Sequence, residues 1–180
     1  MKVLLYILLV IAALIGLLLI TALFVPKSYT VEREVVVNKP KQAVYDYIKY
    51  LKNQDNYSKW NQLDPNMKKS YTGTDGTEGF SYAWDSDNKN AGKGSQDIVK
   101  LTEGERVDFA IHFIKPFKAD ATAYMTTTAV SDTQTKVKWG FNGNMTYPMN
   151  LMLVCMNMDK MVGDDLQVGL NNLKTLLEKQ

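Results

Sequence analysis

The stretch PMNLMLVCMNMDKMVGDDLQVGLNNLKTLLE, residues 148–178, decides the fold of this chain. Its apolar residues recur at helical spacing from Met149 to about Glu178, which predicts a helix about 45 Å long at ~1.5 Å per residue. Projected at about 100° per residue, many of them fall on one stripe, and we expect this stripe to face a β-sheet. The stripe consists of Leu151, Met152, Cys155, Val162, Leu166, Leu170, Leu173 and Leu177.

The first three turns of this helix are apolar nearly all round. Residues 148–161 hold five of the chain's nine methionines, and several of them project outside the stripe. A helix of this kind must be enclosed on several sides, or must meet an apolar partner other than its own sheet. The segment is about half as long as a membrane-spanning helix and contains Asn150, Asn157 and Asp159, so it does not cross a bilayer.

Three interpretations of these methionines remain open. Met149, Met152 and Met156 could converge on Cu(I), a soft metal that accepts thioethers. No histidine supports such a site, because the only one, His112, falls on the polar face of a strand, where we expect it to be solvated. Packing in an ordinary core is the commoner use of methionines at helical spacing. The third interpretation is a pocket wall, since an unbranched, polarisable side chain can repack around different apolar guests.

Upstream of this helix, the chain reads as a strand, short helices and a ladder of strands. SYTVEREVVV (28–37) alternates and then becomes β-branched, as strands do. NKPKQAVYDYIKYLKNQDNYSKW (38–60) has helical spacing and predicts one or two short helices. Short alternating runs separated by turn residues then predict an antiparallel meander. Its strands are expected at 68–72, 79–85, 94–101, 105–114, 118–130 and 134–144.

One face of this sheet is expected to be apolar and aromatic, because side chains alternate across a strand. A sheet with one wet face must cover the other, and the terminal helix is the element long enough to do so. The sequence therefore predicts an α+β domain in which an antiparallel sheet of about seven strands packs on one long helix. The expected dry face carries Phe80, Tyr82, Trp84, Val107, Phe109, Ile111, Phe113, Val137, Trp139 and Phe141.

The N-terminus predicts a membrane anchor. Residues 3–25 carry no charge, and at about 1.5 Å per residue this run exceeds the roughly 30 Å of a bilayer's hydrocarbon. The alternative is a cleaved signal peptide, but its apolar core is only about 7–15 residues long and Ile20-Thr21-Ala22 is a poor cleavage site. We therefore predict two parts, an uncleaved single-pass anchor (1–26) and a domain (27–180) on the extracytoplasmic side.

Composition restricts the partners of the domain. The formal net charge of +2 comes with no basic block and no acidic tail, so we expect no nucleic-acid partner. The single cysteine, Cys155, cannot form an internal disulfide and stands among apolar residues, where we expect it to be a small buried hydrophobe. The partners we expect are a hydrophobic small molecule or lipid, and the membrane through the N-terminal anchor.

Several strings along the chain resemble the SRPBCC superfamily, the START-related helix-grip fold of polyketide cyclase/dehydrase and lipid transport proteins. They are the opening strand followed by NKPKQAVYDYI, the short helices ending in YSKW, the meander, and GDDLQVGLNNLK in the closing helix. The resemblance covers 29–180 and looks particularly like small bacterial members with an N-terminal membrane segment. It implies a curved antiparallel sheet that grips the long helix, with a hydrophobic cavity between them.

Three functions are compatible with this reading. We favour a membrane-tethered binding or carrier domain for a hydrophobic small molecule or lipid held between the sheet and the C-terminal helix. The second is a cyclase/dehydratase-like enzyme using Asp159, Tyr82 or Tyr124. The third is a structural or partner-binding module whose core is filled by its own side chains. The sequence contains no Ser-His-Asp set, HExxH, CxxC or Rossmann fingerprint, so we assign no catalytic residue and expect no metal or cofactor.

Two further expectations concern individual side chains. Asp159 projects near the inward stripe, where a carboxylate is costly unless it is paired, and we expect a structural partner such as Lys160 or a strand lysine. Asp164 and Asp165 are expected to solvate the outer side of the helix. The predicted ligand-binding residues are Tyr82, Trp84, Phe109, Ile111, Trp139, Phe141, Met152, Met156 and Val162.

Overall fold

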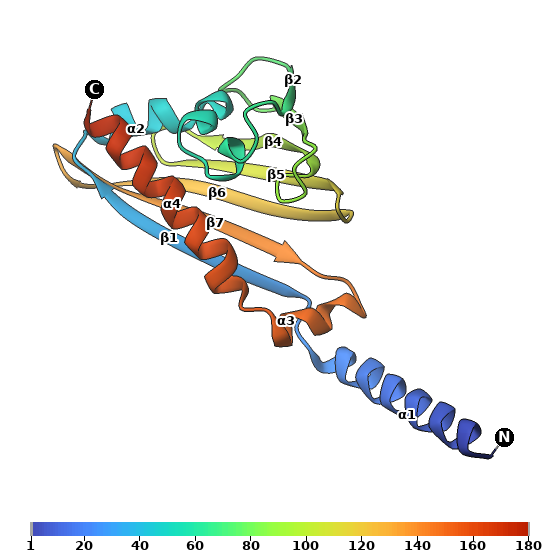
Figure 1. The fold of residues 1–180 in the computed structure, drawn as a ribbon. Coiled ribbons are helices and arrows are strands. Elements are labelled where there is room, and N and C mark those ends of the chain that lie inside the picture. The colour runs from blue at the N-terminus through green and yellow to red at the C-terminus, as the bar shows by residue number, and fades with distance from the viewer. Residues whose placement is uncertain (1, 180) are drawn as a thin grey trace.

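The computed structural model describes residues 2–179, and Figure 1 shows a curved sheet crossed by one long helix, with another helix projecting from the body. The helices are α1 (Lys2–Phe24), α2 (Lys41–Ile48), α3 (Met152–Cys155) and α4 (Met158–Glu178), with 3-10 turns η1 (Leu51–Asn56), η2 (Trp60–Gln62) and η3 (Met149–Leu151). The strands are β1 (Ser28–Val37), β2 (Lys68–Thr72), β3 (Ser81–Asp85), β4 (Lys93–Thr102), β5 (Arg106–Lys115), β6 (Ala119–Ser131) and β7 (Gln134–Asn144).

The seven strands form one antiparallel sheet in the order β1-β7-β6-β5-β4-β3-β2. Strands β2 to β7 are the predicted meander, and each lies within two residues of its expected range. Strand β1 returns to pair with β7 along its whole length, from Ser28 opposite Asn144 to Val37 opposite Thr135. The predicted order of elements and the helix-grip fold are therefore confirmed.

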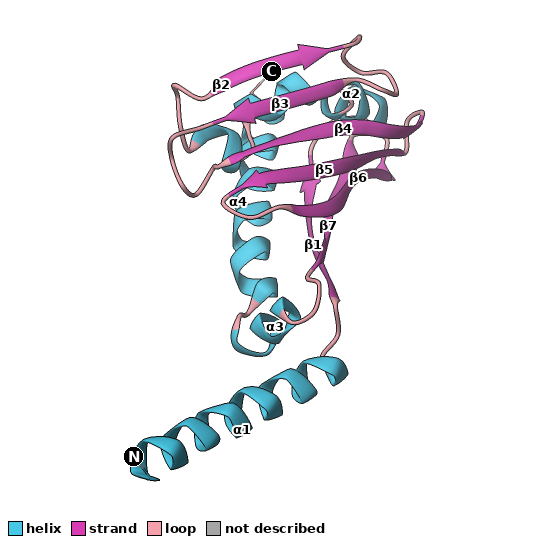
Figure 2. Ribbon diagram, turned by 90° about the vertical axis from the view of Figure 1, so that its right-hand side faces the viewer, coloured by secondary structure: helices cyan, strands magenta, loops and turns pink. Residues whose placement is uncertain are grey.

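Alternation along the strands separates a dry concave face from a wet convex face. On β5, Val107, Phe109 and Ile111 are buried, whereas His112 is exposed and lies 2.7 Å from the Asp120 carboxylate. The dry face is covered mainly by α4, which packs across β1 and β7 (Figures 1 and 2). The core thus lies between this helix and the sheet, as the apolar stripe predicts.

The stripe is confirmed over α4 and is wrong at its start. Leu166, Leu170, Leu173 and Leu177 are buried in the core, and Val162 packs against it. Cys155, in contrast, is exposed, so the prediction that it is a small buried hydrophobe is wrong.

The reason is an interruption of the predicted single helix. Met156 has an extended backbone, and the side chain of Asn157 accepts a hydrogen bond from the backbone N–H of Lys160 at 2.9 Å. An asparagine in this position satisfies one of the first-turn N–H groups that lack a partner within the helix, so a new helix starts after it. The four-residue α3 consequently points in its own direction, which no projection of one continuous helix describes.

Candidate functional site

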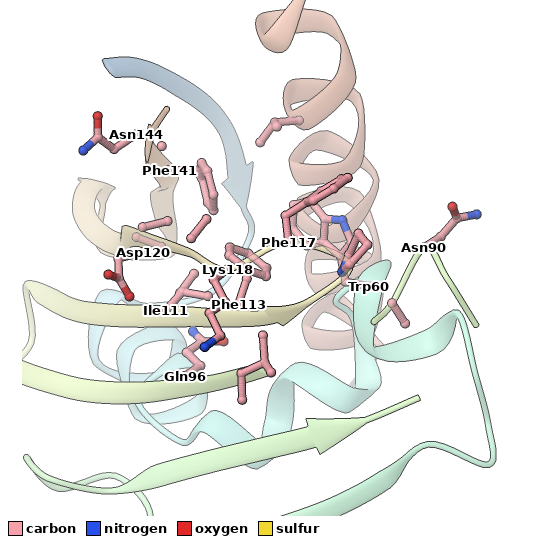
Figure 3. A pocket seen from close by; sticks show the side chains of 18 of the residues that line it. Trp60, Asn90, Gln96, Ile111, Phe113, Phe117, Lys118, Asp120, Phe141 and Asn144 are labelled. Atoms are coloured by element: carbon pink, nitrogen blue, oxygen red, sulfur yellow. The ribbon is translucent and has the colours of Figure 1, made fainter. Parts of the chain in front are cut away.

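A cavity of about 1300 Å³ opens between the concave face of the sheet and the N-terminal half of α4 (Figure 3). Ligand pockets commonly measure roughly 300–1,000 Å³, so this space is large for a domain of this size. Its wall combines segments that are distant in sequence: η2, the ends of β5 and β7, the start of β6, and the methionine-rich turns η3 and α3. The site therefore exists only in the folded chain.

Aromatic rings form much of this wall. Trp60 meets Trp139 edge to face with ring centroids 6.1 Å apart, and Trp84 meets Phe113 in the same way at 6.2 Å. Edge-to-face contacts of this kind hold the rings against each other, so that their flat apolar faces border the cavity. The rings give the cavity an apolar lining.

Two glycines let the tryptophans lie where they do. A Cβ on Gly94 would lie 2.7 Å from the ring of Trp84, and a Cβ on Gly169 would lie 2.8 Å from the ring of Trp139. The indole N–H of Trp84 donates to the carbonyl oxygen of Ala91 at 2.9 Å. Because this polar handle is satisfied by the backbone, the rest of the ring is free to face the cavity.

Polar groups divide into an outer and an inner set. At the outer edges, Asn90, Asp120 and Asn144 point away from the space (Figure 3), and the nearby Lys118 is also exposed. The inner set consists of neutral side chains that are buried, including Gln54 and Gln96. A guest would thus meet apolar surface and a few amides inside, and charge only at the edge.

Residues 28–178 match the sequence profile of the family described as polyketide cyclase/dehydrase and lipid transport. The chain belongs to this family. Its seven-stranded sheet around a C-terminal helix is the helix-grip fold of the SRPBCC superfamily. No curated protein matches the chain.

Solved structures share this fold at low identity. A protein from Thermobifida fusca, solved by NMR in solution, has a TM-score of 0.57 and 18% identity, covering 83% of this chain and 93% of its own. The crystal structure of Ara h 8.0201 has a TM-score of 0.56 and 14% identity, and the match covers 85% of this chain and 99% of that one. Norcoclaurine synthase from Thalictrum flavum, in complex with dopamine and hydroxybenzaldehyde, has a TM-score of 0.62 and 9% identity. The match covers 85% of this chain and 88% of that one. These likenesses support the fold and carry no activity to this SRPBCC chain.

Most residues predicted to bind a ligand lie in the cavity wall of this SRPBCC domain. Phe109 does not line the cavity: it is buried in the core, opposite Ala123 of β6. The residues that do line it are Tyr82, Trp84, Ile111, Trp139, Phe141, Met152, Met156 and Val162.

Sequence reasoning missed several members of the wall. Phe113 shares the alternating face of Ile111, so its strand pattern alone could have placed it there. Trp60 begins the three-residue η2, and Phe117 lies in the turn between β5 and β6; neither position carries a periodic signal. Met149 joins Met152 and Met156 in the wall, so the three methionines considered for Cu(I) share the pocket lining.

The three side chains considered for catalysis lie in different places. Asp159 is exposed, and its carboxylate accepts two hydrogen bonds from the guanidinium of Arg33, at 2.9 and 3.0 Å. The expected lysine partner was therefore wrong; an arginine on β1 takes that place. Tyr124 donates to Glu32, and the hydroxyl of Tyr82 lies 3.5 Å from the sulfur of Met67.

Acid–base properties follow from these contacts. Hydrogen bonding by Arg33 lowers the pKa of Asp159, which favours a permanent carboxylate over a general acid. Burial raises the pKa of Tyr82, and burial together with the Glu32 contact raises the pKa of Tyr124 to about 12. Three other carboxylates lie on α4. Asp164 is exposed beside Lys160, as expected, and Glu178 pairs with Lys174. Asp165, expected to be solvated, is half-buried and pairs with Lys59.

We predict a folded-state pKa of Asp159 below the ordinary aspartate value of about 3.9. Arg33 stabilises the ionised form, so the stabilising contribution of this pair is complete above that value and is lost as the pH falls through the lowered folded-state pKa. An NMR titration of the Asp159 carboxyl group measures it directly. In Arg33→Gln the pKa should return towards the ordinary value, and a pKa at or above that value in the wild type would contradict the prediction.

Proposed function

We propose that this protein is a membrane-tethered binding or carrier domain for a hydrophobic small molecule or lipid, held between the sheet and α4. The observation that carries the proposal is the cavity of about 1300 Å³, whose wall is built from aromatic rings and methionines. A module with a filled core would lack such a space. The volume exceeds the usual range of drug-sized pockets, which favours a guest as large as a lipid chain or a fused ring system.

The distribution of charge favours binding over acid–base chemistry. The charged side chains of the wall are Lys118 and Asp120, and both are exposed at its edge. A general acid or base must reach the reacting group inside the pocket. Met149, Met152 and Met156 instead supply a flexible, polarisable surface, which suits a carrier that accepts related guests.

The membrane part of the proposal rests on α1. This helix of 23 residues is long and apolar enough to span a bilayer, and after Lys2 it carries no charge. We infer that it is retained as an anchor. Mass measurement of the protein extracted from membranes should give the intact N-terminus, and a mature chain that begins between Ala22 and Tyr29 would contradict the inference.

Binding is tested on the full chain purified in mild detergent. We expect native mass spectrometry to detect a co-purified apolar molecule, and a polarity-sensitive probe such as 1-anilinonaphthalene-8-sulfonate to be displaced when a fatty acid or a sterol is added. The matched control is the same protein unfolded in guanidinium chloride. If no bound molecule is detected and no probe is displaced, a module with a filled core is the better description.

We also predict that residues 27–180 fold without the anchor. The core cluster runs from Val31 to Leu177 and includes no residue of α1. A chain that starts at Lys27 should be soluble and unfold in one cooperative thermal transition, measured by circular dichroism. A broad, non-cooperative loss of signal would place the domain boundary elsewhere.

A further inference from the structure

The mouth of the cavity has an apolar rim that faces outward. One side of the rim is the end of β5, where Ile114 is exposed, and the turn that follows it, where Phe117 is 73% exposed. The other side is η3 and α3, where Met149, Cys155 and, at 66%, Val154 are exposed. Both sides also contribute to the wall, through Phe117 on one and Met149 on the other. We call these five residues the rim.

A buried asparagine joins the rim to the end of α1. Asn150 of η3 is fully buried, and its Nδ2 donates to the carbonyl oxygens of Ala22 at 2.7 Å and Val25 at 2.9 Å. The last carbonyls of a helix have no partner within it, so this amide satisfies two groups that would otherwise need water. Ala22 is buried beneath this contact. The domain therefore holds α1 by its last turn, and both views place α3 beside that end (Figures 1 and 2).

The short link between α1 and the sheet adds a second restraint. The backbone N–H of Met145 donates to the carbonyl oxygen of Lys27 at 2.7 Å, which extends the pairing of β1 with β7 almost to the helix. Only Val25 and Pro26 separate this bond from α1. The anchor and the cavity mouth are consequently tied together at two points rather than by a loose linker.

This arrangement fixes the height of the η3 and α3 side of the rim relative to a bilayer. If α1 spans the hydrocarbon, its last turn lies at the boundary with the headgroups, and so does η3, which is bound to that turn and leads directly into α3. Apolar side chains are stable at this boundary, and interfacial segments bury one apolar face there. The exposed cations Lys27 and Lys118 lie next to the rim, where anionic headgroups attract them. Among the residues that line the cavity, the acidic one is Asp120, and it contacts His112.

We propose that the rim docks into the bilayer interface, so that the cavity opens directly onto the lipid phase and takes its guest from there without passage through water. The inference rests on the proposed function for the identity of the guest, but the docking itself can be measured separately. A cavity that opens onto the lipid phase selects a membrane-resident amphiphile rather than a water-soluble metabolite.

The single cysteine provides the test. Cys155 is exposed and belongs to the rim, so the full chain can be labelled there with a nitroxide and reconstituted in vesicles of phosphatidylcholine and phosphatidylglycerol. We expect the label to collide more with oxygen, which concentrates in lipid, than with a water-soluble nickel chelate. The same result is expected for Phe117→Cys in a Cys155→Ser background. The matched control is Val130→Cys in that background, an exposed apolar position near the β6–β7 turn, where nickel should dominate.

A second variant tests the link to α1. Asn150→Ala should shift the Cys155 label towards water and slow the transfer of a fluorescent fatty acid from vesicles several-fold, while binding of that fatty acid in micelles is unchanged. A water-exposed label at both rim positions, or a label shielded from both reagents as in a protein contact, would overturn docking. Failure of the wild-type chain to bind the fatty acid in micelles would instead overturn the proposed function. The depth readings of the label would still decide whether the rim is docked.

Discussion

Replacing Leu170 with alanine is expected to lower the free energy of unfolding by about 2–5 kcal/mol, the largest stability effect we predict. Leu170 is fully buried on the sheet-facing side of α4, within the core cluster. Alanine there removes apolar contacts and leaves a hole that the surrounding side chains fill only in part. For a domain of this size, each kcal/mol lowers the melting temperature by about 2–4 °C, which circular dichroism of the detergent-solubilised chain detects.

Two controls separate the core from the cavity wall. Val168→Ala, at an exposed position of the same helix, should change stability by less than about 0.5 kcal/mol. Met152→Ala should cost less than about 1 kcal/mol, because Met152 is 40% exposed and already lacks partners on the cavity side. A loss at Met152 as large as that at Leu170 would mean that the methionine is packed in a filled core, and the cavity would have to be abandoned.

Filling the cavity from both sides is expected to have the largest effect on binding. Ala121 lies on β6 between Ile111 of β5 and Gly143 of β7, and all three line the cavity. Met152 lines it from α3. The double variant Ala121→Trp with Met152→Trp places two indoles in the space a guest would use. We expect the affinity for an apolar probe to fall at least about tenfold, which corresponds to ~1.4 kcal/mol.

The matched control carries two tryptophans elsewhere. Ala129 is exposed near the far end of β6 and Val168 is exposed on α4, and neither lines the cavity. Ala129→Trp with Val168→Trp should keep the affinity of the wild type, measured by fluorescence titration of the same probe. Equal loss of affinity in both double variants would show that the probe binds to the outer surface and not in the cavity.

The architecture of this domain follows from local patterns in its sequence. Alternation along β5 identifies which side chains are buried, and helical spacing from Val162 to Leu177 identifies the face of α4 that meets the sheet. Both patterns depend only on the geometry of one strand or one helix. They can therefore be read without knowing where any other element lies.

The residues that line the candidate site could be predicted better as a group than one by one. Phe109 and Ile111 share one face of β5, and periodicity cannot distinguish them. In the fold, Phe109 is packed in the core and Ile111 contributes to the cavity wall. Which of two equivalent strand positions borders the open space depends on where the helix crosses the curved sheet.

The sequence by itself determined the class of the fold, the order of its elements, the dry face of the sheet and an apolar N-terminal helix of membrane-spanning length, because each is encoded in residues close together in the chain. Only the tertiary structure decided the volume of the cavity, the break at Asn157 that turns Cys155 outward, and the hold of Asn150 on the end of α1. The partners in the last contact are more than 120 residues apart. Such contacts depend on how packed elements meet in space, and no local period records that.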